Sequence, residues 1–250
     1  MLSGHHMLRA CGPRPIIITI SANAYDVNWK ALAGNPSGAV QSVLVIAPGV
    51  RIGSANPLAT YSLRTGGFAA GSYRKLINNG SINGHGGQDS YPAGGDAIYL
   101  DEDVEIDNAG GEIFGGGGSG AWGFPAGTQG GLNATGGGGS GGGQGFDGGA
   151  GGLGDSAGAG WTEPGSDGNP GGVASPGIGG QGGSNGFYGT HGGTGGTGGT
   201  WGQPGSVSSA NSNGQTNTSV GAAGYAVRRN GHSITWVGGY NAAQVKGVVA

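Results

Sequence analysis

Alternation of apolar and polar residues predicts short β-strands in the first third of the chain. These segments are rich in Ile, Val and Thr, which favour strands over helices. The predicted strands span residues 16–23, 42–46, 50–52 and 60–63. One short helix is predicted over 26–32, with Asp26 as its N-cap and Gly34 as its stop signal.

A degenerate internal repeat follows. Residues 77–84 read INNGSING and residues 106–115 read IDNAGGEIFG. Each copy is interpreted as two short strands around an Asn/Gly corner, because Asn and Gly tolerate positive φ. Between the copies, apolar residues at mostly even spacing over 97–106 predict one strand with one solvent-facing side.

The pattern then changes, because residues 115–205 interleave runs of Gly with isolated aromatic residues. The chain has 67 Gly among 250 residues, far above the usual share. Disordered linkers are the alternative, but linkers combine Gly with Ser and charge rather than with Trp and Phe. Thr recurs every third residue over 194–200, which matches the three-residue turn of an extended left-handed helix. We therefore expect a bundle of such helices whose backbones hydrogen-bond to one another.

Gly is expected to be essential where these backbones meet, because a side chain would hold them apart. Fixing each residue costs roughly 1–2 kcal/mol, so the backbone hydrogen bonds must be nearly complete. Better-folded segments at 76–114 and 222–250 are expected to nucleate and cap the bundle. The candidate structural glycines are Gly116, Gly137, Gly142, Gly182, Gly195 and Gly198.

The last part of the chain returns to ordinary complexity. A Ser/Asn-rich loop at 206–219 precedes residues 224–237, which are predicted to form a β-hairpin around an Asn230-Gly231 type I′ turn. Residues 243–249 suggest one more strand. The predicted organisation is a β-rich attachment region at 1–75, a nucleating strand repeat at 76–114, a glycine-rich binding domain at 115–205 and closing strands at 206–250.

Charge is unevenly distributed. Lys and Arg are absent from residues 76–227, whereas every carboxylate except Asp26 lies there. A nucleic-acid groove needs Lys and Arg, so nucleic acid is excluded as the ligand of the glycine-rich region. The densest carboxylates lie at 101–107; a calcium site is one interpretation and a solvated turn is the other.

Motifs for catalysis or cofactor binding are not recognised. A phosphate-binding loop needs a Gly-Lys-Ser/Thr sequence, and the glycine-rich region has no Lys. His85, His191 and His232 lie among turn residues without a paired nucleophile, and no His/Cys spacing suggests zinc. We expect no enzyme activity, cofactor or metal. The alternative is glycoside cleavage by two carboxylates of the acidic stretch.

The N-terminus shows no export signal, and no apolar run has the length of a membrane span. Cys11 is the single cysteine, so no internal disulfide is expected. Both features suggest synthesis in a reducing cytoplasm.

Aromatic residues interrupt the Gly runs, often beside Pro. Large aromatic side chains are typical of recognition loops, because they offer wide contacts at little cost in rotamer entropy. The alternative is that these rings plug the ends of the bundle as a small core. The candidate binding residues are Trp122, Phe124, Trp161, Phe187, Tyr188 and Trp201.

The middle of the chain resembles the strand-to-polyglycine transition of tailed-phage tail-fibre tip adhesins. The residues that carry this resemblance are 77–84, Ala97-Ile98 and IDNAGGEIFGGGG at 106–118. Residues 224–249 resemble their closing segment. The relatives are adhesins of T-even-type long tail fibres and glycine-rich lambdoid-type host-specificity tips. The resemblance implies a mostly β fold in which short strands precede a polyglycine-II helix sandwich that a C-terminal β-hairpin closes.

The resemblance also implies a role. Such a protein sits on the virion at the tip of the tail fibre, is made in the host cytoplasm, and binds an outer-membrane protein or a surface glycan of the bacterium. Its partner would be a trimeric fibre shaft, or copies of itself in a homotrimer, without nucleic acid or membrane insertion. The implied variable loops are 121–129, 155–170, 184–188 and 201–217.

Two rival functions remain open. An ice-binding or extracellular structural glycine-rich protein would use Thr194, Thr197 and Thr200 as a flat ice-facing row. A glycan-degrading tailspike would release oligosaccharide from the host polysaccharide.

Overall fold

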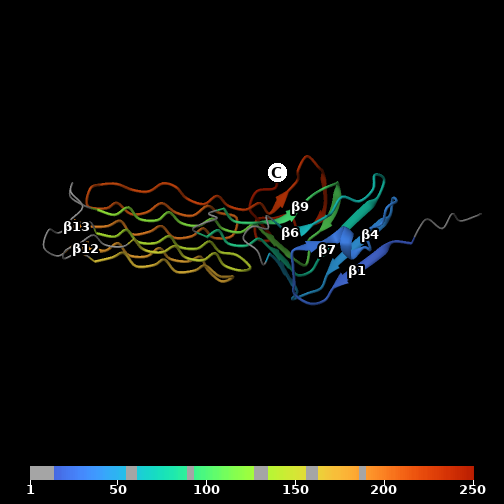
Figure 1. Ribbon diagram of the computed structural model, residues 1–250. Helices are drawn as coiled ribbons and strands as arrows, with labels where there is room; N and C mark the ends of the chain where they lie inside the picture. Colours follow the sequence, from blue (N-terminus) through green and yellow to red (C-terminus); the bar gives the residue numbers. More distant parts are fainter. Residues whose placement is uncertain (1–13, 55–60, 89–92, 127–134, 156–162, 186–189) are drawn as a thin grey trace, which may run out of the picture.

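The structure is a computed structural model that describes residues 14–54, 61–88, 93–126, 135–155, 163–185 and 190–250. The molecule is elongated, with a β-rich part at one end and long, irregular, nearly straight segments of chain extending from it (Figure 1). We call the first part the solenoid and the second part the glycine body.

The solenoid consists of three parallel sheets. The first has the order β1 (Ile16–Ile20), β4 (Gln41–Ile46), β7 (Tyr73–Asn78), β10 (Val104–Asp107) and β15 (Ile234–Gly238). The second has the order β16 (Val245–Lys246), β11 (Glu112–Phe114), β8 (Ser81–Asn83), β5 (Arg51–Gly53) and β2 (Ala24–Tyr25). The third has the order β14 (Val227–Arg228), β9 (Asp96–Tyr99), β6 (Tyr61–Arg64) and β3 (Val27–Asn28).

The chain visits these sheets in a fixed rotation, one strand of each per coil. The strands β1, β2 and β3 form the first coil, and the next two coils repeat the order. The fourth coil begins with β10 and β11, and β14 completes it only after the chain has built the glycine body. The first sheet lies on the side of the solenoid that is farther from this body (Figure 1).

Columns of apolar side chains fill the solenoid. In the first sheet, Leu44 pairs in register with Leu76, and Leu76 pairs with Ile106. All three are buried, and each such side chain contributes about 1.5–3 kcal/mol on leaving water. The columns of the other two sheets are Ile52, Ile82 and Ile113, and Leu63, Ile98 and Val227.

The internal repeat corresponds to two successive turns of this solenoid. Its strand–corner–strand interpretation is confirmed, since β7 and β8, like β10 and β11, are separated by a short corner. The alignment of the first strands differs by one residue, because Ile106 pairs with Leu76 and not with Ile77. Buried Asn78 and Asn108 therefore meet at the corner, where the Asn78 Nδ2 donates to the Asn108 Oδ1 at 2.7 Å.

Several predicted elements differ from the structure. The helix α1 spans Trp29–Leu32 and is capped by Asn28, whereas Asp26 has a φ of 49° and lies outside it. The strand predicted over 97–106 is two strands, β9 and β10, because Leu100 turns into the core between them. The domain boundary expected after Lys75 falls inside β7.

The predicted C-terminal β-hairpin is wrong. The Asn230-Gly231 turn is present, with φ values of 49° and 84°. However, β14 before it pairs with β9, and β15 after it pairs with β10 in another sheet. The turn therefore leads the chain from one sheet of the solenoid to the next. The strand suggested at 243–249 corresponds to β16.

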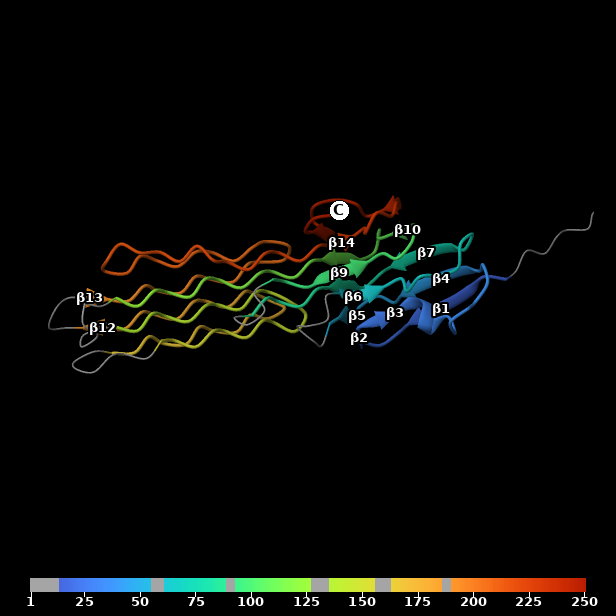
Figure 2. The same cartoon turned by 45° about the horizontal axis from the view of Figure 1, so that its top comes forward.

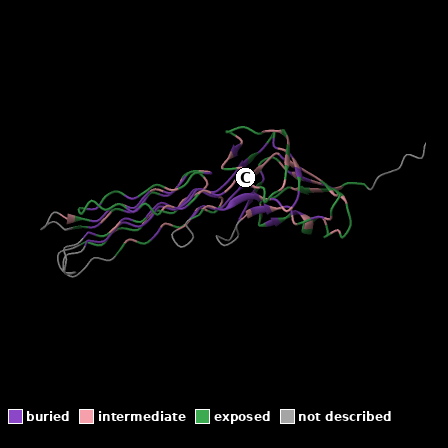
Figure 3. Ribbon diagram, turned by 90° about the horizontal axis from the view of Figure 1, so that it is seen from above, coloured by how far each residue is buried: buried purple, intermediate pink, exposed green. Residues whose placement is uncertain are grey.

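Backbone hydrogen bonds hold the glycine body together. Every third N–H group of residues 117–123 donates to a carbonyl of 138–144 at 2.8–2.9 Å. The same spacing carries bonds from 138–144 to 193–199 at 2.9–3.0 Å, and from 193–199 back to 118–124 at 2.6–2.8 Å. Three segments thus close a ring of mutual bonds, and buried backbone runs along the inner segments (Figure 3).

The tight approach of these segments leaves no room for side chains at many glycines. At each of the six candidate structural glycines, a methyl group would overlap a backbone carbonyl oxygen of a neighbouring segment. For Gly137 that oxygen belongs to Gly123, and for Gly195 it belongs to Gly139. Gly172 differs, because a methyl group there would meet nothing.

Candidate distal binding site

Several segments of the glycine body end close together on the side that is far from the solenoid, which we call the distal end (Figure 2). A bridge joins Ala126 to Thr135, and the strands β12 (Ser184–Asn185) and β13 (Thr190–His191) form an antiparallel pair. The Glu163 N–H donates to the Ser184 carbonyl at 3.1 Å, which holds the segment that begins at Glu163 beside this pair of strands.

At the distal end, hydrogen bonds from polar side chains help to join the segments of the glycine body. Buried Asn211 donates from its Nδ2 to the Pro125 carbonyl at 2.8 Å, and its Oδ1 accepts from the Gln215 N–H at 2.9 Å. The His191 N–H donates to the Ser212 Oγ at 2.6 Å. Asn211 and Ser212 therefore tie this turn to two other segments, at Pro125 and at His191. Asn211 carries little signal in the sequence, because it lies in a stretch rich in Ser and Asn.

An aromatic pair lies on the flank next to the distal end. The rings of Trp122 and Phe124 are 5.0 Å apart and perpendicular, and Trp122 is 41% exposed. Together with Pro125, Leu153 and Asp155 they line a hollow of about 420 Å³. Leu153 is 80% exposed, so it forms no core of the body. This flank offers a large apolar contact beside one carboxylate.

The other predicted binding residues are placed differently. Trp161, Phe187 and Tyr188 lie outside the described residues. Trp201 lies at the junction with the solenoid, where its ring packs 5.7 Å from that of Phe114. The structure thus brings together Trp122 and Phe124, but not Trp201.

The implied variable loops are only partly loops. Residues 165–171 run beside 149–155, to which they donate backbone bonds at 2.8–3.0 Å. Residues 205–209 likewise follow the body, and the chain reaches the distal end again at Asn211. The N–H groups of Thr194 and Thr197 donate to the Oγ atoms of Ser209 and Ser206, so the Thr row lies beside another segment of the body.

Carboxylates of the acidic stretch form ion pairs between the coils of the solenoid. Arg64 binds both carboxylate oxygens of Asp101 at 2.7 and 2.8 Å, which links one coil to the next. Burial acts to raise the pKa of Asp101, but the bonds from Arg64 and the Gly66 N–H outweigh it and leave this pKa below its ordinary value. Glu105 also links two coils, because one of its carboxylate oxygens pairs with the Lys75 Nζ at 2.7 Å.

The part of the chain that the structure describes contains no group of three His, Cys, Asp or Glu residues that could hold a metal ion. Among these residues there is also no helix long and apolar enough to cross a membrane. The side chain of His85 is buried beside the Gly86 carbonyl, and that of His232 lies 3.7 Å from Asp103.

Comparison with known proteins gives two matches. A family model described as phage tail fibre adhesin Gp38 matches residues 15–249. A chain in the crystal structure of the gp37–gp38 adhesin tip complex of the bacteriophage S16 long tail fiber is 26% identical, with a TM-score of 0.56. The match covers 91% of the present chain and 80% of that chain. A search of curated proteins found no match.

Proposed function

Since this chain belongs to the Gp38 family of phage tail fibre adhesins, we propose that its distal end binds the bacterial receptor while its solenoid holds the tail fibre. The chain is a receptor-binding adhesin of the virion's tail fibre. The family favours this role over an ice-binding or structural protein. We propose that it acts by binding alone, without cleaving a glycan.

The observation that carries the proposal is the separation of the two ends. Segments from four parts of the sequence meet at the distal end, and the solenoid lies on the opposite side of the glycine body (Figure 2). Exposed side chains on the flank of this end, such as those of Trp122 and Leu153, take no part in the backbone bonds between the glycine segments. Their identity can therefore change without cost to the scaffold, which suits recognition of varying receptors.

We propose that the glycine body is a sandwich of polyglycine-II helices. Bonding at every third residue is what a helix with three residues per turn produces. Overlap of any side chain with neighbouring carbonyl oxygens explains why Gly recurs at the contacts. Such a body would hold the distal loops stiffly, because each segment is bonded to several others.

We propose that the tail fibre docks on the first coil of the solenoid. Within the described residues, β1 pairs with β4 alone and leaves its other edge open. Ile17, Tyr25 and Leu32 are exposed on this coil, and an open edge with apolar side chains suits docking of another β structure. A gp37–gp38 complex is named for the S16 structure. Light scattering of the purified chain distinguishes a monomer from the homotrimer.

Competition for adsorption tests the receptor role. We expect purified protein to block phage adsorption to host cells, and the Trp122→Ala/Phe124→Ala variant to need about tenfold more protein, as is typical of aromatic contact residues. Tyr240→Ala, which removes an exposed ring from the solenoid, is the matched control. Host strains lacking outer-membrane proteins or surface polysaccharide separate the two receptor classes. Absence of competition by the wild-type protein would refute the function. Full competition by the double variant would show that the flank does not contact the receptor.

A further inference from the structure

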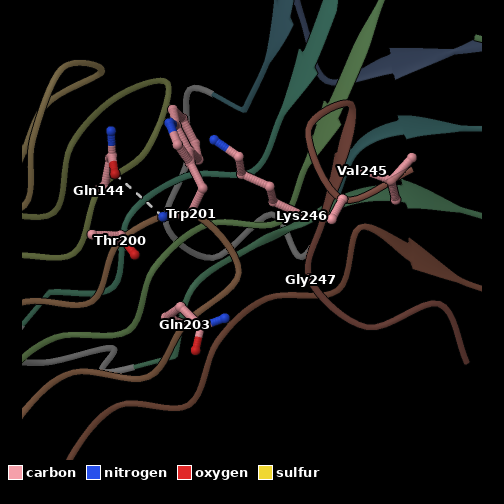
Figure 4. A pocket seen from close by; sticks show the side chains of 8 residues that line it. Gln144, Thr200, Trp201, Gln203, Val245, Lys246 and Gly247 are labelled. Carbon is pink, nitrogen blue, oxygen red and sulfur yellow. Dashed lines mark hydrogen bonds between the residues drawn. The ribbon is translucent and has the colours of Figure 1, made fainter. Parts of the chain in front are cut away.

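A second pocket lies at the junction of the glycine body and the solenoid (Figure 4). Its volume is about 590 Å³, which falls in the range of small-molecule sites. Turns from three parts of the chain line it: Gln144, residues 200–203 and residues 242–247. The distal site and this junction pocket share no residue.

Trp201 is held rigidly at the pocket. Its indole packs against the Phe114 ring of β11, with the ring centres 5.7 Å apart, and its backbone N–H donates to the Gln144 Oε1 at 3.2 Å. Gln144 is itself fixed, since its Nε2 donates to the Val173 carbonyl at 2.8 Å. A half-buried indole fixed in this way offers a preformed apolar surface to a ligand.

Lys246 supplies a positive charge next to this surface. Its Nζ lies 4.5 Å from the centre of the Phe114 ring, and its side chain extends toward Trp201 (Figure 4). In the described part of the chain, the ion pairs involve Arg64, Arg74, Lys75, Arg228 and His232, and none involves Lys246. An ammonium group held over rings without a carboxylate partner can take up an anion.

Neutral polar groups complete the lining. Thr200 and Gln203 are exposed and offer a hydroxyl and an amide, which can donate and accept hydrogen bonds. The combination of an aromatic surface, hydroxyl and amide groups and one cation matches a sugar ring that carries an acidic group. The apolar face of a pyranose covers an indole, its hydroxyl groups bond to amides, and its acidic group pairs with Lys246.

We propose that the junction pocket binds a pyranose bearing a carboxylate or phosphate, as a unit of an acidic surface polysaccharide. The site is separate from the receptor contact at the distal end. It depends on the proposed function only in that the bacterial surface is where the protein would meet this ligand. Because it lies on the side of the molecule, it would add a lateral contact and raise avidity.

Nuclear magnetic resonance of the tryptophan indole groups tests the proposal. The Trp201 signal is assigned by its loss in Trp201→Phe, and the remaining indole signals report on the fold. The probes are methyl β-D-glucuronide and glucose 6-phosphate, with methyl β-D-glucoside as the neutral control and inorganic phosphate as the control for an anion alone.

We expect both acidic sugars to shift the Trp201 signal saturably, with an affinity about fivefold above that of the neutral sugar. Lys246→Gln should lower their affinity to that of the neutral sugar, whereas Trp122→Ala should leave it unchanged. The proposal is overturned by no saturable shift, by unaltered affinity in Lys246→Gln, or by an equal response to phosphate alone, which would mean an adventitious ion only. Since the probes are soluble sugars, these results do not depend on whether the protein blocks adsorption.

Discussion

At the scale of single residues, the glycines of the body are not equivalent. Gly137 lies against the Gly123 carbonyl, whereas Gly172 faces open space. Both belong to runs of Gly, so the sequence pattern alone predicts that close contacts exist but does not tell which glycines make them. The same holds for Trp201 and Trp122: both stand beside Gly runs, and only the folded chain separates the junction from the distal flank.

Substitution of Gly137 by Ala should therefore destabilise the protein strongly. The added methyl group overlaps a carbonyl oxygen that is fixed by the neighbouring segments, and we expect a loss of about 3 kcal/mol, as for severe overpacking. Gly172→Ala is the matched control and should change the free energy of unfolding by less than about 0.5 kcal/mol. Chemical denaturation measures both. Equal stability of the two variants would contradict close packing of the body.

At the scale of elements, periodicity predicted strands well and their partners poorly. Alternation over 42–46 and the Ile-rich run at 16–20 identify strands because one side of each must face a core. Pairing depends on residues far apart in the sequence. The Asn230-Gly231 turn is a hairpin signal, yet both flanking strands find parallel partners in preceding coils. The local signal was outweighed by the column of buried side chains that continues through Val227.

The ion pair between Lys75 of β7 and Glu105 of β10 makes the solenoid sensitive to acid. Hydrogen bonds from Lys75 and from Tyr73 lower the pKa of Glu105. Its stabilising effect is therefore present above the ordinary glutamate pKa of about 4.3 and is lost as pH falls through the lower folded-state pKa. Glu105→Gln should lower the melting temperature near pH 7, and the difference from the wild-type protein should shrink as pH falls from the ordinary glutamate pKa through the lower folded-state pKa.

Glu102→Gln is the informative comparison, because burial raises the pKa of Glu102 while Arg74 opposes the shift. A carboxylate whose folded-state pKa is raised costs stability when it is charged, and this cost disappears as pH falls through that pKa. Glu102→Gln should therefore not share the loss near neutral pH. Melting curves of both variants across the acid range measure the difference; the same response in both would contradict the assigned pKa directions.

At the scale of the whole molecule, the glycine body is an insertion into the solenoid. The chain leaves after β11 and returns at β14, within one coil. The sequence pattern predicts successive domains along the chain, because composition changes sharply near residues 115 and 205. It could not show that the segments before and after the insertion share one core, since that depends on contacts between Leu63, Ile98 and Val227.

Deletion of the insertion should consequently leave a folded solenoid. Gly118 and Gly221 lie against each other, so a short Gly-Ser linker can replace residues 119–220 without moving β11 or β14. The apolar columns lie outside the deleted segment, so we expect a β-type circular dichroism spectrum and cooperative thermal unfolding. The shortened protein should still bind the tail fibre and should no longer compete for adsorption to host cells. If it is unfolded, the body would be required for the solenoid core; if it still blocks adsorption, the receptor contact would lie on the solenoid and not at the distal end.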